Sequence, residues 1–334
     1  MALATPYLMF VGDAPDQLAA KVAIGVVHWR PDWCVGQLRL AGCKADLGIP
    51  DMTIADAVKA GCKTMVIGVA NRGGVIPDNW VGVIVEAIEA GMDVAAGLHR
   101  RLRDVPAIAE AAARHGRTLT DARHPSRDFD VASGQARAGR RILTVGTDVS
   151  VGKMFTSLAI EREMTARGMN ADFRATGQTG IFIAGDGASV DAVVADFIAG
   201  AAEWLTPAND PDHWDVVEGQ GSLFHASYSG VTLGLIHGSR PHALVLCHDA
   251  ARREMRGTPG VPVPTLEDCI AVNERMARMF EPDATVVGVS VNTSSMDDAR
   301  AQAYLAETAG RLGLPVVDAV RTGVAPIVDA IEKL

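Results

Sequence analysis

The stretch that most constrains the fold is ILTVGTDVSVGKM at residues 142–154. An apolar run ends at Gly146, a short loop follows, and Gly152 and Lys153 open a segment with helical character over about 152–167. This is the strand, loop and helix of a phosphate-binding P-loop with the spacing GxxxxGK, in which backbone N–H groups converge on an anion. The usual pattern continues with a Ser or Thr that holds Mg²⁺, but Met154 stands there. The stretch therefore predicts a phosphate cradle that lacks its usual magnesium ligand.

Short apolar runs alternate with helix-like segments along the first part of the chain. The runs are 7–11, 23–27, 65–69 and 92–96, and the segment 81–91 has helical periodicity. Such alternation is typical of an α/β fold with a mainly parallel sheet. A polar segment rich in Arg and Asp, residues 121–141, then interrupts the pattern, as a linker does.

A second series of apolar runs follows the linker, at 142–146, 171–176, 214–219, 243–249, 284–292 and 314–320. It predicts a second unit with a doubly wound parallel sheet, and Gly-rich turns after several strands lie where ligands bind in such sheets. With about 150 residues per domain as a guide, we predict two domains, at 1–135 and 136–334.

Composition excludes several classes of protein. The chain of 334 residues is 48% hydrophobic, carries a net charge of -9 and contains no apolar run of about 18 residues that could span a membrane. The acidic balance disfavours nucleic acid as a partner, and the N-terminus lacks the features of a secretory signal, which favours a cytoplasmic location. The five cysteines are odd in number and form no CxxC pair, so we expect reduced thiols and no zinc site.

Lys153 stands out against this composition. The chain has six lysines and 25 arginines, and Lys153 is the only lysine between Lys63 and Lys333. A compact ammonium group has been kept at this position in a chain that otherwise uses arginine.

Two resemblances extend this interpretation. GTDVSVGK and VVEGQGS (216–222) are similar to the P-loop and acidic strand end of dethiobiotin synthetase, but only in the C-terminal half. GVANRGG (68–74), GTDVSVGKM, ATGQTGI (175–181) and the stretch 216–241 together resemble the D-glutamate N-acetyltransferase family over both halves. That resemblance implies an N-terminal Rossmann-like domain, a C-terminal P-loop domain, and transfer of an acetyl group from acetyl-coenzyme A to a D-amino acid, D-glutamate by resemblance.

The resemblance also suggests an explanation for Met154. Acetyl-coenzyme A carries a pyrophosphate that a P-loop can bind without breaking a phosphoanhydride, so no metal and no metal-holding hydroxyl are expected. The residues expected to contact it are Gly146, Thr147, Asp148, Ser150, Val151, Gly152, Lys153, Met154 and Asn292, the last at the position where dethiobiotin synthetase-like proteins contact adenine.

Two side chains are candidates for the base that takes a proton from the attacking amine. Glu218 ends the strand DVVEG, and His225 follows seven residues later with a pKa naturally near neutrality. A helix-capping role or a pair with Lys153 for Glu218, and a structural role for His225, remain open. For the substrate we expect Asn71 and Arg72 in NRGG and Gln178 and Thr179 in the Gly-rich crossover, with Arg72 gripping a carboxylate.

Two other functions remain as alternatives. If Thr147 or Thr156 supplied the missing hydroxyl, the protein would be an ATP-dependent ligase or kinase of the dethiobiotin synthetase type. A non-catalytic nucleotide-sensing module is the third possibility. A symmetric homo-oligomer is the expected state for such an enzyme.

Overall fold

The chain forms two compact α/β units, each built on a parallel sheet as the sequence predicts. The computed structural model describes residues 3–125 and 127–334, with the backbone alone for Arg72. Unit 1 runs to Asp128 and also takes Gly177–Ala192, whereas unit 2 comprises Phe129–Thr176 and Val193–Leu334.

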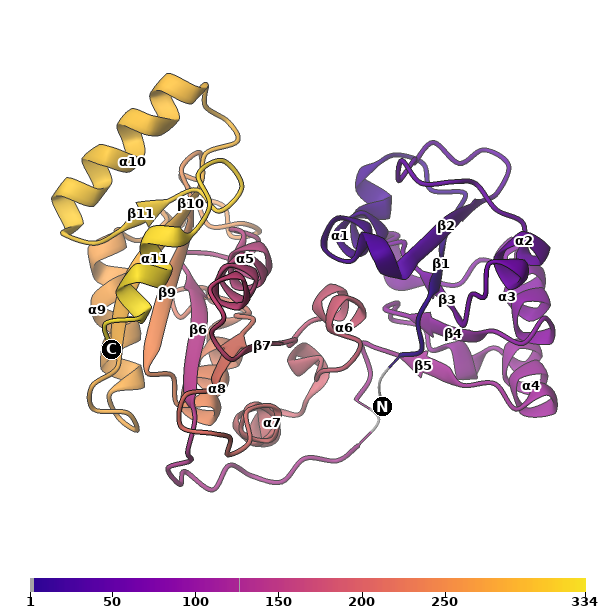
Figure 1. The fold of residues 1–334 in the computed structure, drawn as a ribbon, viewed down its shortest axis with the longest axis horizontal. Helices are drawn as coiled ribbons and strands as arrows, with labels where there is room; N and C mark the ends of the chain where they lie inside the picture. Colours follow the sequence, from indigo (N-terminus) through magenta and orange to yellow (C-terminus); the bar gives the residue numbers. More distant parts are fainter. Residues whose placement is uncertain (1–2, 126) are drawn as a thin grey trace. The chain divides into compact units, whose positions relative to one another are not determined.

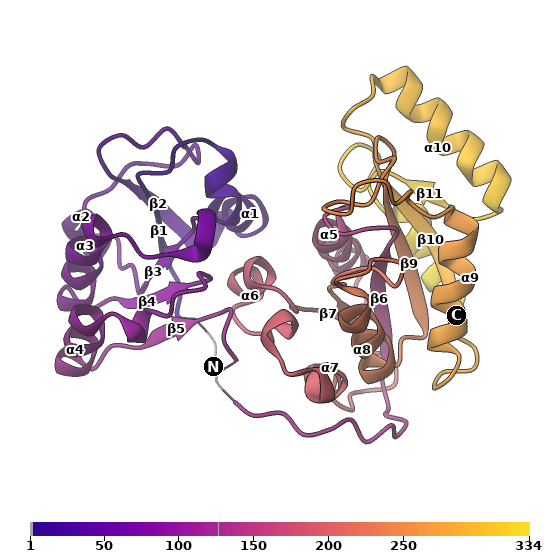
Figure 2. The same ribbon diagram turned by 180° about the vertical axis from the view of Figure 1, so that it is seen from behind.

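Unit 1 holds a sheet of five parallel strands in the order β2-β1-β3-β4-β5. The strands are β1 (Tyr7–Gly12), β2 (Cys34–Arg39), β3 (Thr64–Ile67), β4 (Asp93–Ala96) and β5 (Leu119–Asp121). The helices are α1 (Lys21–Trp29), α2 (Ile54–Lys59), α3 (Asp78–Glu89), α4 (Pro106–His115) and α6 (Gln178–Ala184). Figures 1 and 2 show α1 and α6 on one face of the sheet and α2, α3 and α4 on the other.

The apolar run 23–27 is part of helix α1, so our expectation of a strand there is wrong. Val22, Ala23, Val26 and Trp29 are buried, because α1 packs against the sheet and also against α6. A helix buried on two sides is apolar around most of its circumference, and a short run of it reads like a buried strand.

Helix α6 lies beside α1 and covers the same face of the unit 1 sheet (Figure 1). It comes from the crossover after β7, and within it Ile181, Phe182 and Ile183 are buried. The N–H of Leu3 donates to the carbonyl of Gly185 at 2.8 Å, just beyond the helix. Unit 1 is therefore built from two stretches of sequence separated by almost fifty residues of unit 2.

Unit 2 holds a sheet of six parallel strands in the order β11-β10-β9-β6-β8-β7, with the P-loop strand inside it. The strands are β6 (Arg140–Gly146), β7 (Ala171–Arg174), β8 (Trp214–Val217), β9 (Ala243–Asp249), β10 (Thr285–Asn292) and β11 (Val316–Val317). The helices are α5 (Lys153–Ala166), α7 (Ile198–Leu205), α8 (Ser229–Ser239), α9 (Leu266–Ala277), α10 (Asp298–Leu312) and α11 (Ala325–Ile331). Helix α5 packs against α11, and α8 packs between α7 and α9.

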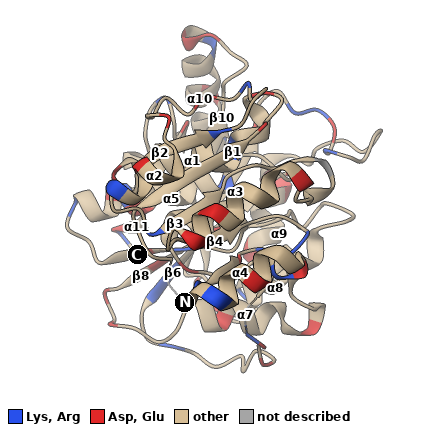
Figure 3. Ribbon diagram, turned by 90° about the vertical axis from the view of Figure 1, so that its right-hand side faces the viewer, with Lys and Arg blue, Asp and Glu red and all other residues tan. Residues whose placement is uncertain are grey.

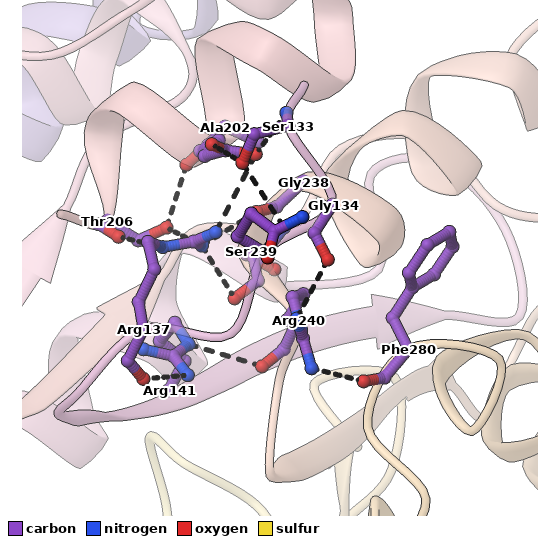
Figure 4. A network of polar contacts seen from close by, with 12 residues as sticks. Ser133, Gly134, Arg137, Arg141, Ala202, Thr206, Gly238, Ser239, Arg240 and Phe280 are labelled. Atoms are coloured by element: carbon purple, nitrogen blue, oxygen red, sulfur yellow. Dashed lines mark hydrogen bonds and ion pairs between the residues drawn. The ribbon is translucent and has the colours of Figure 1, made fainter. Parts of the chain in front are cut away.

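Three arginines, of which Arg141 is buried and Arg137 and Arg240 are half-buried, fix the end of the polar segment 121–141 to unit 2 (Figure 4). Arg137 donates to the carbonyls of Thr206, at 2.9 Å, and Gly238, at 2.8 Å. Arg240 donates to the carbonyl of Gly134 at 3.0 Å, and Arg141 donates to the carbonyl of Arg240 at 3.2 Å. Burial, together with nearby arginines, lowers the pKa of Arg141 to about 10. These contacts bind residues 134–141 to the C-terminal ends of α7 and α8.

This segment passes so close to α7 that Gly200 leaves no room for a side chain. A Cβ on Gly200 would lie 1.7 Å from the carbonyl oxygen of Asp130, whereas a Cβ on Gly310 in α10 would meet nothing within 4 Å. We expect Gly200→Ala to destabilise unit 2 by about 1–3 kcal/mol through overpacking. The matched Gly310→Ala should stabilise by about 0.5–1 kcal/mol, as Ala does for Gly inside a helix. Thermal melting of both variants tests this, and an unchanged melting temperature for Gly200→Ala would contradict the close contact.

The cysteines are free thiols, as predicted, with four buried and Cys43 half-buried. On the side that Figure 3 presents, acidic and basic positions are interspersed along the ribbon. In the described part of the chain, no helix combines the length and apolar character needed to cross a membrane.

Candidate functional site

The P-loop joins β6 to α5 in the conformation that its glycines favour. Gly152 precedes the helix in the left-handed region, at φ 98°, and Ser150 takes a positive φ of 55° that is uncommon for a residue with a side chain. This backbone brings the loop to the N-terminus of a helix of 14 residues, where unpaired N–H groups and the helix dipole favour an anion.

Lys153 is folded back into this loop. Its Nζ donates to the carbonyl oxygen of Asp148 at 2.9 Å, and its side chain is buried. A Cβ on Gly146 would lie 2.9 Å from this Nζ, so glycine at that position makes room for the lysine. Burial lowers the pKa of Lys153 to about 8, although Cys247, Asp148 and Glu218 oppose the shift. Because burial disfavours the charged form of Lys153, a bound anion would stabilise its ammonium group more than it would that of an exposed lysine.

The lowered pKa makes anion binding dependent on pH. Above pH 8 the unliganded lysine is largely neutral and must take up a proton when an anion binds. Sulfate remains a dianion over this range, so we expect its affinity to be nearly constant from pH 6 to 7 and to fall up to about ten-fold per pH unit above about 8. Calorimetry in buffers of different ionisation enthalpy should detect the proton uptake. Lys153→Arg, which stays charged, should remove the dependence above pH 8, and an equally steep fall in that variant would contradict the assignment.

Thr147 and Asp148 are placed in the loop as predicted, but their side chains are engaged within the protein. The Thr147 hydroxyl lies 3.0 Å from Nδ1 of His248, and both Thr147 and Asp148 are fully buried. The Asp148 carboxylate accepts from Arg252 at 2.6 Å and from the Arg256 N–H at 2.8 Å. Asp148 thus ties the loop after β9 to the P-loop. Sequence reasoning missed this role, because the partners lie more than 100 residues away.

Thr156, on α5, is the other residue whose hydroxyl could replace the missing magnesium ligand, and its hydroxyl is also hydrogen-bonded within the protein. Thr156 Oγ1 donates to Ser290 Oγ at 2.8 Å, inside the unit. Met154 lies half-buried in the first turn of the helix.

Glu218 lies directly after β8, beside the P-loop lysine, with which it interacts electrostatically. Its Oε2 accepts from the Thr176 N–H at 3.0 Å, and its Oε1 accepts from Gln220 Nε2 at 3.1 Å. Gly219 fits tightly against β6, since a Cβ there would lie 1.6 Å from the carbonyl oxygen of Thr144. The buried carboxylate is therefore held in one place at the carboxyl end of the sheet.

His225 lies in the loop between β8 and α8, and both of its ring nitrogens are bonded. Nε2 lies 2.9 Å from the Arg256 carbonyl, and the Ser227 N–H donates to Nδ1 at 3.1 Å. A carbonyl only accepts and an N–H only donates, so the ring is a neutral tautomer with its proton on Nε2. With its basic nitrogen already accepting a bond, the buried ring is suited to supporting the Arg256 loop, whereas the carboxylate oxygens of Glu218 keep further lone pairs.

A cavity of about 440 Å³ opens next to the P-loop, between α5, the end of β10 and residues 318–321. Asn292, predicted to contact a base, lines it, and its Oδ1 accepts from the Ser294 N–H at 3.0 Å. Val151, Phe155 and Val320 contribute apolar wall, and Val320 is 77% exposed. Phe155 and Val320 were not anticipated, because an apolar residue in a helix or loop reads as ordinary core.

The predicted substrate residues all belong to unit 1, at the carboxyl end of its sheet. Asn71 closes the loop after β3 by donating to the Val75 carbonyl and accepting from its N–H. The side chain of Arg72 lies outside the described residues, although its backbone forms a 3-10 turn, Arg72–Gly74.

Gln178 and Thr179 begin α6 in the same unit. With its amide oriented to satisfy both partners, Gln178 donates to the Gly97 carbonyl after β4 and accepts from Arg123 at 3.2 Å. Thr179 is half-buried in the same turn. The loops after β3 and β4 also meet, since the Arg100 N–H donates to the Gly74 carbonyl at 2.9 Å.

Among the residues that the structure describes, no group of three or more His, Cys, Asp or Glu side chains could hold a metal ion.

Comparisons with known proteins cover the whole chain. The family model described as a DUF1611 P-loop domain matches residues 130–328, and the one described as a DUF1611 Rossmann-like domain matches residues 38–125. The chain is 56% identical over 330 residues to a D-glutamate N-acetyltransferase from Tritonibacter scottomollicae, covering 99% of each chain. It is 46% identical over 328 residues to a D-glutamate N-acetyltransferase from a Pseudoalteromonas species, covering 98% of this chain and 99% of the relative. The crystal structure of a DUF1611 family protein from Anabaena variabilis superposes with a TM-score of 0.86 at 32% identity, over 99% of this chain and 100% of that one.

Proposed function

Because the chain belongs to the DUF1611 family, with two full-length relatives that are D-glutamate N-acetyltransferases, we propose that it transfers an acetyl group from acetyl-coenzyme A to the amino group of D-glutamate. The family membership carries the reaction, and the geometry of unit 2 supports the choice of donor. We infer the roles of individual residues from that geometry.

The donor's charged and aromatic parts match two adjoining features of unit 2. A pyrophosphate suits the P-loop, where Lys153 and the N-terminus of α5 provide positive charge. The cavity beside it has an apolar wall with Asn292 at the end of β10, which suits an adenine ring with a polar edge. The observation that carries this assignment is that the cradle and the cavity share Val151 and Gly152.

In the proposed reaction, the amino nitrogen attacks the thioester carbonyl carbon. A C–N bond forms, the C–S bond breaks, and the sulfur leaves as a thiolate. The substrate amine is mostly protonated at neutral pH and loses two protons on becoming an amide. Glu218 takes one of them before or during the attack. The other passes to the departing thiolate, which gives the free thiol of coenzyme A.

Free thiol release from acetyl-coenzyme A with a panel of D- and L-amino acids tests the proposed function. We expect release with D-glutamate and much less with L-glutamate. ADP release that requires Mg²⁺ and disappears with EDTA would instead favour the ligase or kinase, whereas ligand binding without turnover would favour the sensing module.

Arg72 remains our proposal for the grip on a substrate carboxylate, because it follows β3 at the carboxyl end of a parallel sheet. Arg72→Lys keeps the charge but loses the planar fork. We expect it to raise the KM for D-glutamate by roughly ten-fold, with little change in coenzyme A affinity. Steady-state kinetics check this, with Arg114→Lys on the exposed face of α4 as the control. A wild-type KM, or an equal loss of coenzyme A binding, would place the amino acid elsewhere.

A further inference from the structure

Gln220 contacts the carboxylate oxygen of the proposed base that the Thr176 backbone does not. Its Nε2 donates to Glu218 Oε1 at 3.1 Å and to Thr176 Oγ1 at 3.3 Å. The second carboxylate oxygen, Oε2, accepts from the Thr176 N–H at 3.0 Å. Each oxygen of Glu218 therefore has its own neutral donor.

The two donors are themselves held in place. The Thr232 hydroxyl, on α8, donates to the Gln220 carbonyl at 2.7 Å, and the Thr176 hydroxyl donates to the Glu218 carbonyl at 2.6 Å. Gly221 follows at φ 70°, and a Cβ there would lie 2.4 Å from the Tyr228 carbonyl oxygen. The backbone after Gln220 is therefore closely packed. An amide anchored this way can fix the orientation of its partner.

The ammonium group of Lys153 is a charged group that could draw Glu218 away from its two neutral donors. Lys153 on α5 interacts electrostatically with Glu218, and Asp148 and Arg252 act on that lysine in turn. On β7, Arg174 pairs with Asp215 at 2.6 Å. Without a neutral donor on Oε1, the carboxylate could turn toward Lys153 and become an ion pair.

We propose that Gln220 is a positioning residue for acetyl transfer, which with the Thr176 N–H holds Glu218 as a fixed, ionised proton acceptor and keeps it apart from Lys153. This inference rests on the proposed function, in which Glu218 is the base. Gln220 forms no bond with the reacting atoms and acts only through Glu218.

The test compares Gln220→Met with the wild type across pH. Methionine keeps the length of the side chain and removes the donor, so the Glu218 carboxyl binds its proton more tightly. We expect the acid limb of kcat/KM for D-glutamate to move upward by roughly 0.5–1 pH unit and kcat to fall by roughly ten-fold. Coenzyme A affinity should stay within about two-fold. Gln302→Met, on the exposed surface of α10, is the matched control and should behave as wild type.

A second variant keeps the inference testable if Gln220→Met does not fold. Gln220→Glu places a like charge beside Glu218, so the acid limb should move further upward than in the methionine variant. If the folded variants show the same acid limb of kcat/KM and the same kcat as the wild type, the positioning role is wrong.

Glu218→Gln separates the inference from its premise. If that variant is inactive while the Gln220 variants are normal, only the positioning role fails. If Glu218→Gln keeps wild-type turnover, Glu218 is not the base and both fail.

Discussion

Replacing Glu218 with glutamine should lower kcat for D-glutamate acetylation by roughly 10²–10⁴-fold, the range associated with loss of a general base. Glutamine preserves the shape of the side chain, and its amide oxygen can still accept from the Thr176 N–H that now bonds Glu218 Oε2. It cannot take a proton from the amine. The loss should therefore appear in kcat under saturating substrates, while the dissociation constant of coenzyme A, measured by calorimetry, changes little.

His225→Gln is the matched comparison, since it removes the other candidate base. Both nitrogens of His225 are bonded to backbone groups, so we expect this variant to lower thermal stability more than kcat. If His225→Gln abolished turnover in a folded protein and Glu218→Gln did not, the two roles would have to be exchanged.

Most of the strands could be predicted because parallel strands buried on both faces form short apolar runs. In unit 2, the strands β7 to β11 lie within the predicted runs, and β6 begins two residues before its run, at Arg140. Strand β2, with Gln37 and Arg39, was not anticipated, since a polar strand near the sheet edge lacks the apolar signal. The strand expected at 23–27 is wrong for the opposite reason, because α1 is apolar on two sides.

The assignment of residues 177–192 to unit 1 could not be predicted from local sequence. Nothing within α6 indicates that its apolar residues pack beside α1 rather than on the sheet that precedes it. The evidence that another helix is needed lies in unit 1. Residues up to 128 supply only α1 to cover one face of its five-stranded sheet, and α6 covers the rest of that face (Figure 1). A family resemblance that spans both halves carries no information about which half a crossover joins.

The backbone of the site was easier to predict than the roles of its side chains. A P-loop is a local structure, set by the spacing of Gly146, Gly152 and Lys153, so a single stretch of sequence is enough. The roles of Asp148 and His225 depend on Arg252 and Arg256, which the fold brings in from the loop after β9. Sequence reasoning did not single out Gln220, because the role proposed for it depends on contacts with Glu218 and with Thr176, 44 residues earlier.

Replacing Lys153 with alanine should weaken coenzyme A binding by roughly 10–100-fold, because a charge-assisted hydrogen bond to phosphate contributes about 1.5–3 kcal/mol. Titration calorimetry with coenzyme A measures this directly. Lys153→Met, which keeps most of the buried volume, should show a similar loss, and Lys63→Ala at an exposed site should bind as the wild type does.

The stability of these variants distinguishes a ligand-binding lysine from a structural one. Burial lowers the pKa of Lys153 to about 8, so below that pH the folded protein holds an ammonium group in an unfavourable environment. Removing the charge in Lys153→Met should then leave the melting temperature of the unliganded protein unchanged or raise it at pH 7. The cost of burying the charge outweighs the bond to the Asp148 carbonyl and the attraction of Asp148 and Glu218, which are lost with it. A variant that melts lower than the wild type and still binds coenzyme A with full affinity would make Lys153 a structural residue and would remove the P-loop from the proposed donor site.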